Sequence, residues 1–196
     1  MLVVRQPGRE AVWFANPQGK EQHWLPTKAL NNVANESPLL ADLTGDGRPE
    51  LVYNFRGHMG WAEPNWNEFS WPWEFHKLSP NVRFPRDNQG LGIGDINGDG
   101  RMDVIERTGW WEQPESLKGD PEWVKHPYVF TPKGGALMHV YEVDGDGDYD
   151  VLTRLAALGF FLALVQQTAT EGHRTVVPHP LTCVPPHPTT PFSATT

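Results

Sequence analysis

Three acidic, glycine-rich segments recur at intervals of about fifty residues, and this repeat constrains the fold more than any other feature. The segments are DLTGDGRPE (first loop, 42–50), DINGDGRMD (second loop, 95–103) and EVDGDGDYD (third loop, 142–150), which start 53 and 47 residues apart. Two further markers share the period, namely Trp13, Trp61 and Trp110, and His23, His76 and His126. Such a period is typical of similar units that bury their apolar faces against one another.

Each unit is predicted to contain four short β-strands. Apolar segments of four to six residues flank each loop, and the Trp-bearing and His-bearing segments supply the third and fourth strands. Four short strands per repeat predict a propeller blade. The sequence therefore predicts an all-β fold of three to four four-stranded antiparallel sheets, arranged as the blades of an incomplete ring.

Residues 1–154 are expected to form the blades, and residues 155–196 a degenerate partial blade with a disordered tail rich in Pro and Thr. A complete ring of four to eight blades would need roughly 200–400 residues. We therefore expect a piece of a larger propeller, truncated or frame-shifted after about residue 158. A non-functional fragment is one alternative reading.

The second loop also matches the EF-hand pattern, with Glu106 at the twelfth position. Pro and Gly on both sides leave no room for the helices of an EF-hand. The twelfth residues of the other two loops are Tyr53 and Thr153, whereas the ninth residue is acidic in all three loops. The shared motif is therefore a nine-residue loop.

Oxygen atoms at alternate positions of this loop predict a site for Ca²⁺, which takes six to eight hard oxygen ligands. Positions 1, 3, 5 and 9 would supply side chains and position 7 its backbone carbonyl, and Gly47, Gly100 and Gly147 would allow the turn. The predicted ligand sets are Asp42, Thr44, Asp46, Arg48 and Glu50; Asp95, Asn97, Asp99, Arg101 and Asp103; and Glu142, Asp144, Asp146, Asp148 and Asp150. Up to three ions are expected, and the first loop should bind most weakly because Thr44 replaces Asp or Asn.

At these loops the sequence resembles the FG-GAP and VCBS repeats, the calcium-loop blades of integrin-type β-propellers. The resemblance covers residues 12–154. It implies one cation site in the hairpin of each blade, and a secreted, periplasmic or cell-surface location. It also implies a structural or recognition module for protein or carbohydrate ligands. No signal peptide is visible at the N-terminus, so the sequence leaves the location open.

The aromatic and histidine residues admit more than one role. The candidates for a ligand surface are three tryptophans that lie outside the periodic series, Trp66, Trp71 and Trp73. The periodic Trp residues are expected to pack between blades. The periodic His residues are expected to be structural. His58 and His139 fall outside the register, so a domain of a polysaccharide lyase or sugar dehydratase is the enzymatic alternative.

Charge and composition limit the kinds of partner and of covalent or membrane structure that this chain can have. The net charge of −8 argues against a nucleic-acid partner, and 11 of the 24 acidic residues lie in the three loops, as a cation site requires. The single Cys183 excludes an internal disulfide. The longest apolar run, 155–165, is too short to span a bilayer.

Overall fold

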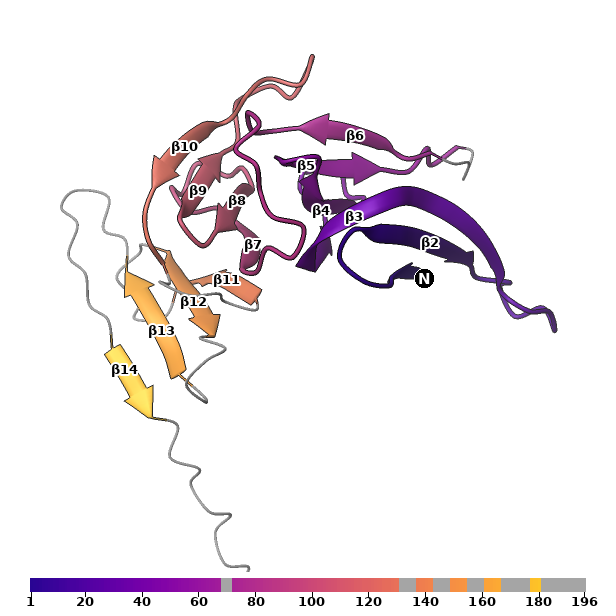
Figure 1. The fold of residues 1–196 in the computed structure, drawn as a ribbon, viewed down its shortest axis with the longest axis horizontal. Helices are drawn as coiled ribbons and strands as arrows, with labels where there is room; N and C mark the ends of the chain where they lie inside the picture. Colours follow the sequence, from indigo (N-terminus) through magenta and orange to yellow (C-terminus); the bar gives the residue numbers. More distant parts are fainter. Residues whose placement is uncertain (68–71, 131–136, 143–148, 155–160, 167–176, 181–196) are drawn as a thin grey trace, which may run out of the picture.

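The computed structural model describes residues 1–67, 72–130, 137–142, 149–154, 161–166 and 177–180, and these residues form strands and loops without helices. The strands are β1 (Leu2–Val4), β2 (Arg9–Ala15), β3 (Leu25–Ala41), β4 (Glu50–Phe55), β5 (His58–Glu63), β6 (Glu74–Lys77), β7 (Leu91–Gly94), β8 (Asp103–Glu106), β9 (Gly109–Glu112), β10 (Val124–Pro127), β11 (Leu137–Tyr141), β12 (Asp150–Arg154), β13 (Phe161–Gln166) and β14 (Val177–Pro180). Figure 1 shows their arrangement. The predicted all-β, incomplete set of blades is confirmed.

The strands form four antiparallel modules. The first contains β1, β2 and the N-terminal part of β3, and the second contains the C-terminal part of β3 with β4, β5 and β6. The third contains β7 to β10, and the fourth β11 to β14. Within each module, strands that follow one another in the chain are also neighbours in the sheet, as the repeat predicts.

The modules are joined into two continuous sheets of six and eight strands, whereas the sequence predicts separate four-stranded sheets. The 17-residue β3 is shared, because it pairs with β2 as far as Val33 and with β4 from Ala34 onward, with a register shift in the second pairing between Ala34 and Leu39. β7 and β11 pair in parallel, with Gly92 opposite Met138. A Cβ atom on Gly92 would lie 2.5 Å from the Met138 carbonyl oxygen, so this junction requires glycine.

The core lies between the modules, because the second and third modules each bury apolar side chains on both faces. In β4, Leu51 and Tyr53 pack toward the first module, while Val52 packs toward the third. In β8, Val104 packs toward the second module and Ile105 toward the fourth. Alternate side chains of a strand point to opposite faces, so each of these strands contributes to two apolar clusters. Burial of this kind couples neighbouring modules.

The periodic Trp and His residues are cross-strand partners. His76 lies opposite Trp61 on β6 and β5, and the two rings stack with centroids 5.1 Å apart. His126 and Trp110 repeat this arrangement on β10 and β9, with centroids 4.1 Å apart. These two pairs explain why both markers share one period. His23, in contrast, is exposed in the connection between β2 and β3.

A glutamate accompanies each stacked pair. Glu112 lies 2.6 Å from Nε2 of His126, and Glu63 lies 3.6 Å from Nε2 of His76. Nδ1 of His76 also contacts Asp120 of the third module at 2.7 Å. These acidic partners hold the two imidazoles at the outer strands, so His76 and His126 have packing and carboxylate contacts in separate modules and do not converge on one point.

Within the described ranges, no helix has the length and apolarity needed to cross a membrane.

Candidate functional site

The acidic loops occupy equivalent hairpins. The first loop connects β3 to β4, the second connects β7 to β8, and the third lies between β11 and β12. The predicted ligands Asp144, Asp146 and Asp148 fall within 143–148, outside the described residues. At the ends of the third loop, Glu142 is exposed and Asp150 is fully buried.

In the first loop, the side chain of Asp42 organises the turn. Its two carboxylate oxygens accept hydrogen bonds from the backbone N–H groups of Gly45, at 2.8 Å, and Gly47, at 2.9 Å. Asp46 accepts a further hydrogen bond from the N–H of Arg48 at 2.8 Å. The carboxylates at positions 1 and 5 are therefore fixed by the backbone of the loop itself.

The second loop repeats this arrangement. Asp95 accepts hydrogen bonds from the N–H groups of Asp99, at 3.0 Å, and Gly100, at 2.8 Å. Asn97 Oδ1 accepts from the same Asp99 N–H at 3.2 Å, so the side chains of positions 1 and 3 converge on one point. Asp99 also forms an ion pair with the guanidinium of Arg101.

Glycines provide the backbone conformation of both turns. Gly47 has a φ of 83° and Gly100 a φ of 86°, a left-handed region that other residues rarely adopt. The prediction that these two glycines shape the loop is confirmed. Gly45 and Gly98 have the same conformation, with φ of 77° and 73°.

The ninth-position acids lie at the base of each loop and are completely buried. Glu50 accepts hydrogen bonds from the N–H groups of Leu43 and Thr44, at 2.9 and 3.1 Å. Asp103 accepts from the N–H groups of Ile96, at 3.0 Å, and Gln113, at 2.9 Å. Loss of solvent raises the pKa of Glu50, and raises that of Asp103 to about 6.

One residue of the Trp segment distinguishes the two sites. Gln113 donates its backbone N–H to Asp103 Oδ1, but the equivalent residue after the Glu of the preceding repeat is Pro64, which has no N–H. Oε1 of Glu50 is accordingly buried and has no hydrogen-bond partner within the described structure. The sequence contains this difference, since GWAEPN has Pro64 at the position that Gln113 occupies in GWWEQP. Its effect on the hydrogen bonds of Glu50 can be recognised only when the pairing of the strands is known.

Gln113 also connects the two loops. Its side-chain amide donates to the carbonyl oxygen of Leu43 in the first loop at 2.8 Å, and to that of Met102 in the second loop at 3.1 Å. Its own carbonyl oxygen accepts from Nε of Arg101 at 2.9 Å. Sequence reasoning did not single out this buried glutamine, which ties two repeats together through the base of their loops.

The donor set at both loops consists of carboxylate and carbonyl oxygens, with the hydroxyl of Thr44 in the first loop and the amide of Asn97 in the second, and it fits a hard cation such as Ca²⁺. Among the described residues, no group of three or more His, Cys, Asp or Glu side chains is already arranged around one metal position. The carboxylates of positions 1 and 5 are turned toward the N–H groups of their own loop, and one faces Arg101.

The three tryptophans predicted as a ligand surface have different environments. Trp66 is partly exposed and lines an open pocket of about 490 Å³ beside the first loop, where Arg48 lies 5.8 Å from its ring. Trp73 is only 6% exposed and packs against Trp13, with centroids 6.0 Å apart, so its indole belongs to the core. Trp71 falls outside the described residues.

The two histidines outside the periodic register lie in different modules. His58 contacts the carbonyl oxygen of Ser79 through Nδ1 at 2.9 Å. His139 is exposed on β11, with its ring centroid 6.2 Å from that of Tyr141. The structure therefore does not bring His58 and His139 together with Trp66.

Residues 42–105 match the family model of the FG-GAP-like repeat. The match begins at the first residue of the first loop and ends within β8, so it includes both described loops and the strands between them. The predicted resemblance is confirmed for this repeat. Among the curated proteins and among the solved structures, none matches this chain.

Proposed function

We propose that this chain, whose residues 42–105 form an FG-GAP-like repeat, is a calcium-binding β-propeller module that presents a recognition surface to protein or carbohydrate ligands. Up to three ions bind in the hairpin loops. They rigidify the loops, and the sheets between them display the ligand surface.

The observation that carries the calcium proposal is a pair of buried carboxylates without basic partners. Glu50 and Asp103 are 0% exposed, and neither forms an ion pair with Lys, Arg or His in the described part of the chain. Burying an ionised carboxylate is costly unless a cation compensates its charge. A divalent ion above each acid would supply that compensation.

The rest of each loop supports the same assignment. The residues that would hold the ion are those at positions 1, 3, 5 and 9, with the backbone carbonyl of position 7. In the second loop, two of them already share one N–H group, which brings their oxygens onto one side of the turn. The first loop offers the hydroxyl of Thr44 at the equivalent of Asn97, so we expect it to bind more weakly than the second.

When bound, calcium supplies positive charge that offsets the clustered carboxylates and cross-links both ends of the hairpin. Arg101 already approaches Asp99 from the same loop. Its guanidinium would move away from this carboxylate as the ion enters, while its backbone carbonyl oxygen remains as a ligand.

Calcium is expected to stabilise the fold because it binds only the native loops. Raising free Ca²⁺ from an EDTA-buffered solution to 5 mM should raise the calorimetric melting midpoint by about 3–10 °C. The Asp95→Asn/Asp99→Asn variant should lose most of this shift. A matched variant, Glu115→Gln/Glu122→Gln, removes two exposed acids outside the loops and should retain it. An unchanged midpoint in the unmodified protein rejects the calcium proposal.

The recognition part of the proposal rests on the pocket that contains Trp66. Its lining combines this indole with Asp46, Arg48 and Glu63, a set that suits the apolar face and the hydroxyl groups of a neutral sugar. On an array of neutral oligosaccharides, we expect binding that weakens by at least about tenfold in Trp66→Ala. Trp24→Ala, which truncates an indole that is 42% exposed, is the control. Equal binding by both variants excludes this pocket.

A further inference from the structure

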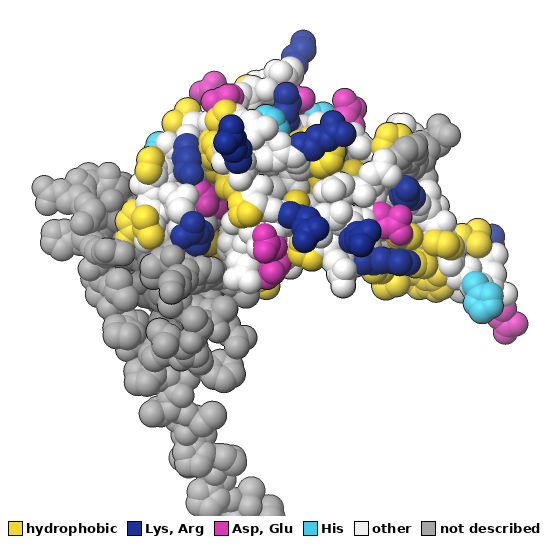
Figure 2. All heavy atoms as spheres, in the orientation of Figure 1, with side chains coloured by type: hydrophobic (Ala, Val, Ile, Leu, Met, Phe, Trp, Pro, Cys, Tyr) yellow, Lys and Arg dark blue, Asp and Glu magenta, His cyan; other side chains and the backbone are white. Residues whose placement is uncertain are grey.

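A second surface lies at the end of the sheets opposite the acidic loops, and it is rich in arginine. Successive turns of an antiparallel sheet alternate between its two ends, so the β4–β5 turn lies away from the β3–β4 hairpin that carries the first loop. This turn, the β1–β2 turn and the β6–β7 connection together bear Arg5, Arg56, Arg83 and Arg86, and Arg9 is the first residue of β2. Basic side chains are prominent on the face in view in Figure 2.

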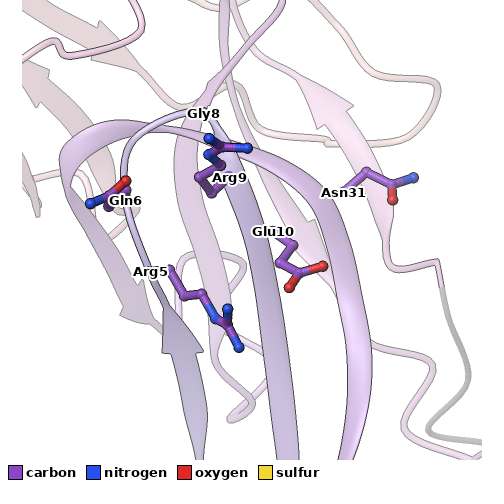
Figure 3. Close-up of a pocket in the computed structure, with 6 residues that line it drawn as sticks. All are labelled: Arg5, Gln6, Gly8, Arg9, Glu10 and Asn31. Carbon is purple, nitrogen blue, oxygen red and sulfur yellow. The ribbon is translucent and has the colours of Figure 1, made fainter.

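These residues line three adjoining hollows of about 690, 370 and 530 Å³. Asn31 borders the first and second hollows, and Arg56 and Phe84 border the second and third. The aliphatic stem of Arg86 also packs directly against Gly8, which lines the first. The three hollows therefore adjoin one another, and together they are called here the arginine groove. Figure 3 shows Arg5, Arg9 and Glu10 at its first end, with Asn31 on the neighbouring strand.

Two of the arginines are held in an unfavourable backbone conformation. Arg56 has a φ of 51° and Arg83 a φ of 58°, values that are uncommon for residues other than glycine. Asn81 fixes both, because its Nδ2 donates to the Arg56 carbonyl oxygen and its Oδ1 accepts from the Arg83 N–H, each at 3.1 Å. Strain of this kind concentrates at ligand-binding sites, where the backbone is held in place before the ligand arrives.

Five arginines line the groove, against one acidic side chain of the described lining, Glu10. Within the described residues, none of the five arginines forms an ion pair with an acidic side chain. Glu10 lines the groove but lies 3.8 Å from Nζ of Lys28. The chain as a whole carries a net charge of −8, so five arginines without acidic partners at one end represent a local reversal of sign.

We propose that the arginine groove binds an acidic polysaccharide, in which sugar rings carry carboxylate groups along a linear chain. Guanidinium groups form paired hydrogen bonds with carboxylates. The phenyl ring of Phe84 and the side-chain amide of Asn31 lie along the same groove and suit the C–H faces and hydroxyl groups of the rings. The site is independent of calcium and of the pocket at Trp66.

Other polyanions fit the groove less well. A single-stranded nucleic acid would need aromatic side chains on which its bases stack, and among the residues that the structure describes the groove lining has only Phe84 and Phe55, of which Phe55 already lies under the guanidinium of Arg56. An acidic peptide would lose more conformational entropy on binding than a chain of rigid sugar rings. Both remain as outcomes of the test.

The test is calorimetric titration with hexagalacturonate at low ionic strength. We expect saturable binding that weakens by at least about tenfold in Arg56→Asn/Arg83→Asn. Asn tolerates the left-handed conformation at both positions, so the variant should keep the melting midpoint of the unmodified protein. Lys20→Gln/Lys118→Gln removes two exposed positive charges elsewhere and should bind as the unmodified protein does.

Neutral maltohexaose, hexaglutamate and a single-stranded RNA dodecamer serve as competing ligands. Failure of hexagalacturonate to bind, or tighter binding of the peptide or the RNA, would overturn the proposal. Equal weakening by both double variants would also overturn it, because that result assigns the binding to net charge and not to the groove. Asp95→Asn/Asp99→Asn should bind hexagalacturonate normally, which separates this site from the calcium proposal.

Discussion

Replacing Trp111 with Ala is expected to lower the free energy of unfolding by about 3–5 kcal/mol. Trp111 is 2% exposed and lies in the apolar cluster between the second and third modules, together with Val52, Leu91 and Val104. Truncation leaves a cavity where two sheets meet, and the backbone pairing on either side of β9 limits collapse around it. Urea denaturation followed by far-ultraviolet circular dichroism measures the change.

The same measurement on Trp24→Ala provides the control, because this indole is 42% exposed and its loss should change stability by less than about 0.5 kcal/mol. Trp111→Phe should fall between the two variants and remains informative if the alanine variant does not fold. A loss below about 1 kcal/mol for Trp111→Ala would contradict the assignment of this cluster as the inter-module core.

In the absence of divalent cations, the protein is expected to become more stable as the pH falls from 7.5 to 5. Asp103 has a pKa of about 6 in the folded chain, against an ordinary value of 3.8, because burial disfavours its charged form. Between these two values the folded state binds more protons than the unfolded state, so unfolding becomes harder as protons are added. The full contribution of this group is about 3 kcal/mol, present below pH 4 and lost as the pH rises through 6, and about 1.4 kcal/mol of it falls between pH 7.5 and 5.

Urea denaturation in EDTA at several pH values measures this dependence. Asp103→Asn removes the titrating group at constant size, and the slope of its stability against pH should be flatter, whatever its absolute stability. Glu50 shifts in the same direction and leaves a residual slope in the variant. Identical slopes for the two proteins would show that Asp103 does not titrate in this range.

The repeat predicts the larger part of this fold, because its three markers, the acidic loops and the Trp and His series, have local causes in the repeats where both rings are paired. The acidic loops are hairpins whose side chains bond to their own backbone, and the Trp and His residues meet across adjacent strands. Such contacts depend on spacing within one repeat. The strand order within each module and the glycine conformations of the loops therefore follow from the sequence.

Contacts between repeats were not predictable in the same way. The parallel pairing of β7 with β11 depends on two backbones that approach where Gly92 leaves space. The link from Gln113 to Leu43 joins residues 70 positions apart. The arginine groove combines residues from three separate segments, and each segment alone contains too few basic residues to predict an anion-binding site. These features require the register of several strands to be known together.

The sharing of β3 between two modules affects how this chain can be divided. A protease cut or an engineered boundary near Ala34 would leave the β2 pairing in one half and the β4 pairing in the other, but it would divide the apolar cluster that contains Val33, Leu51 and Tyr53. Each half would then expose the apolar side chains that now pack against the other half, and exposed apolar patches favour aggregation. Fragments designed for expression should keep residues 25–41 intact, with β2 on one side and β4 on the other.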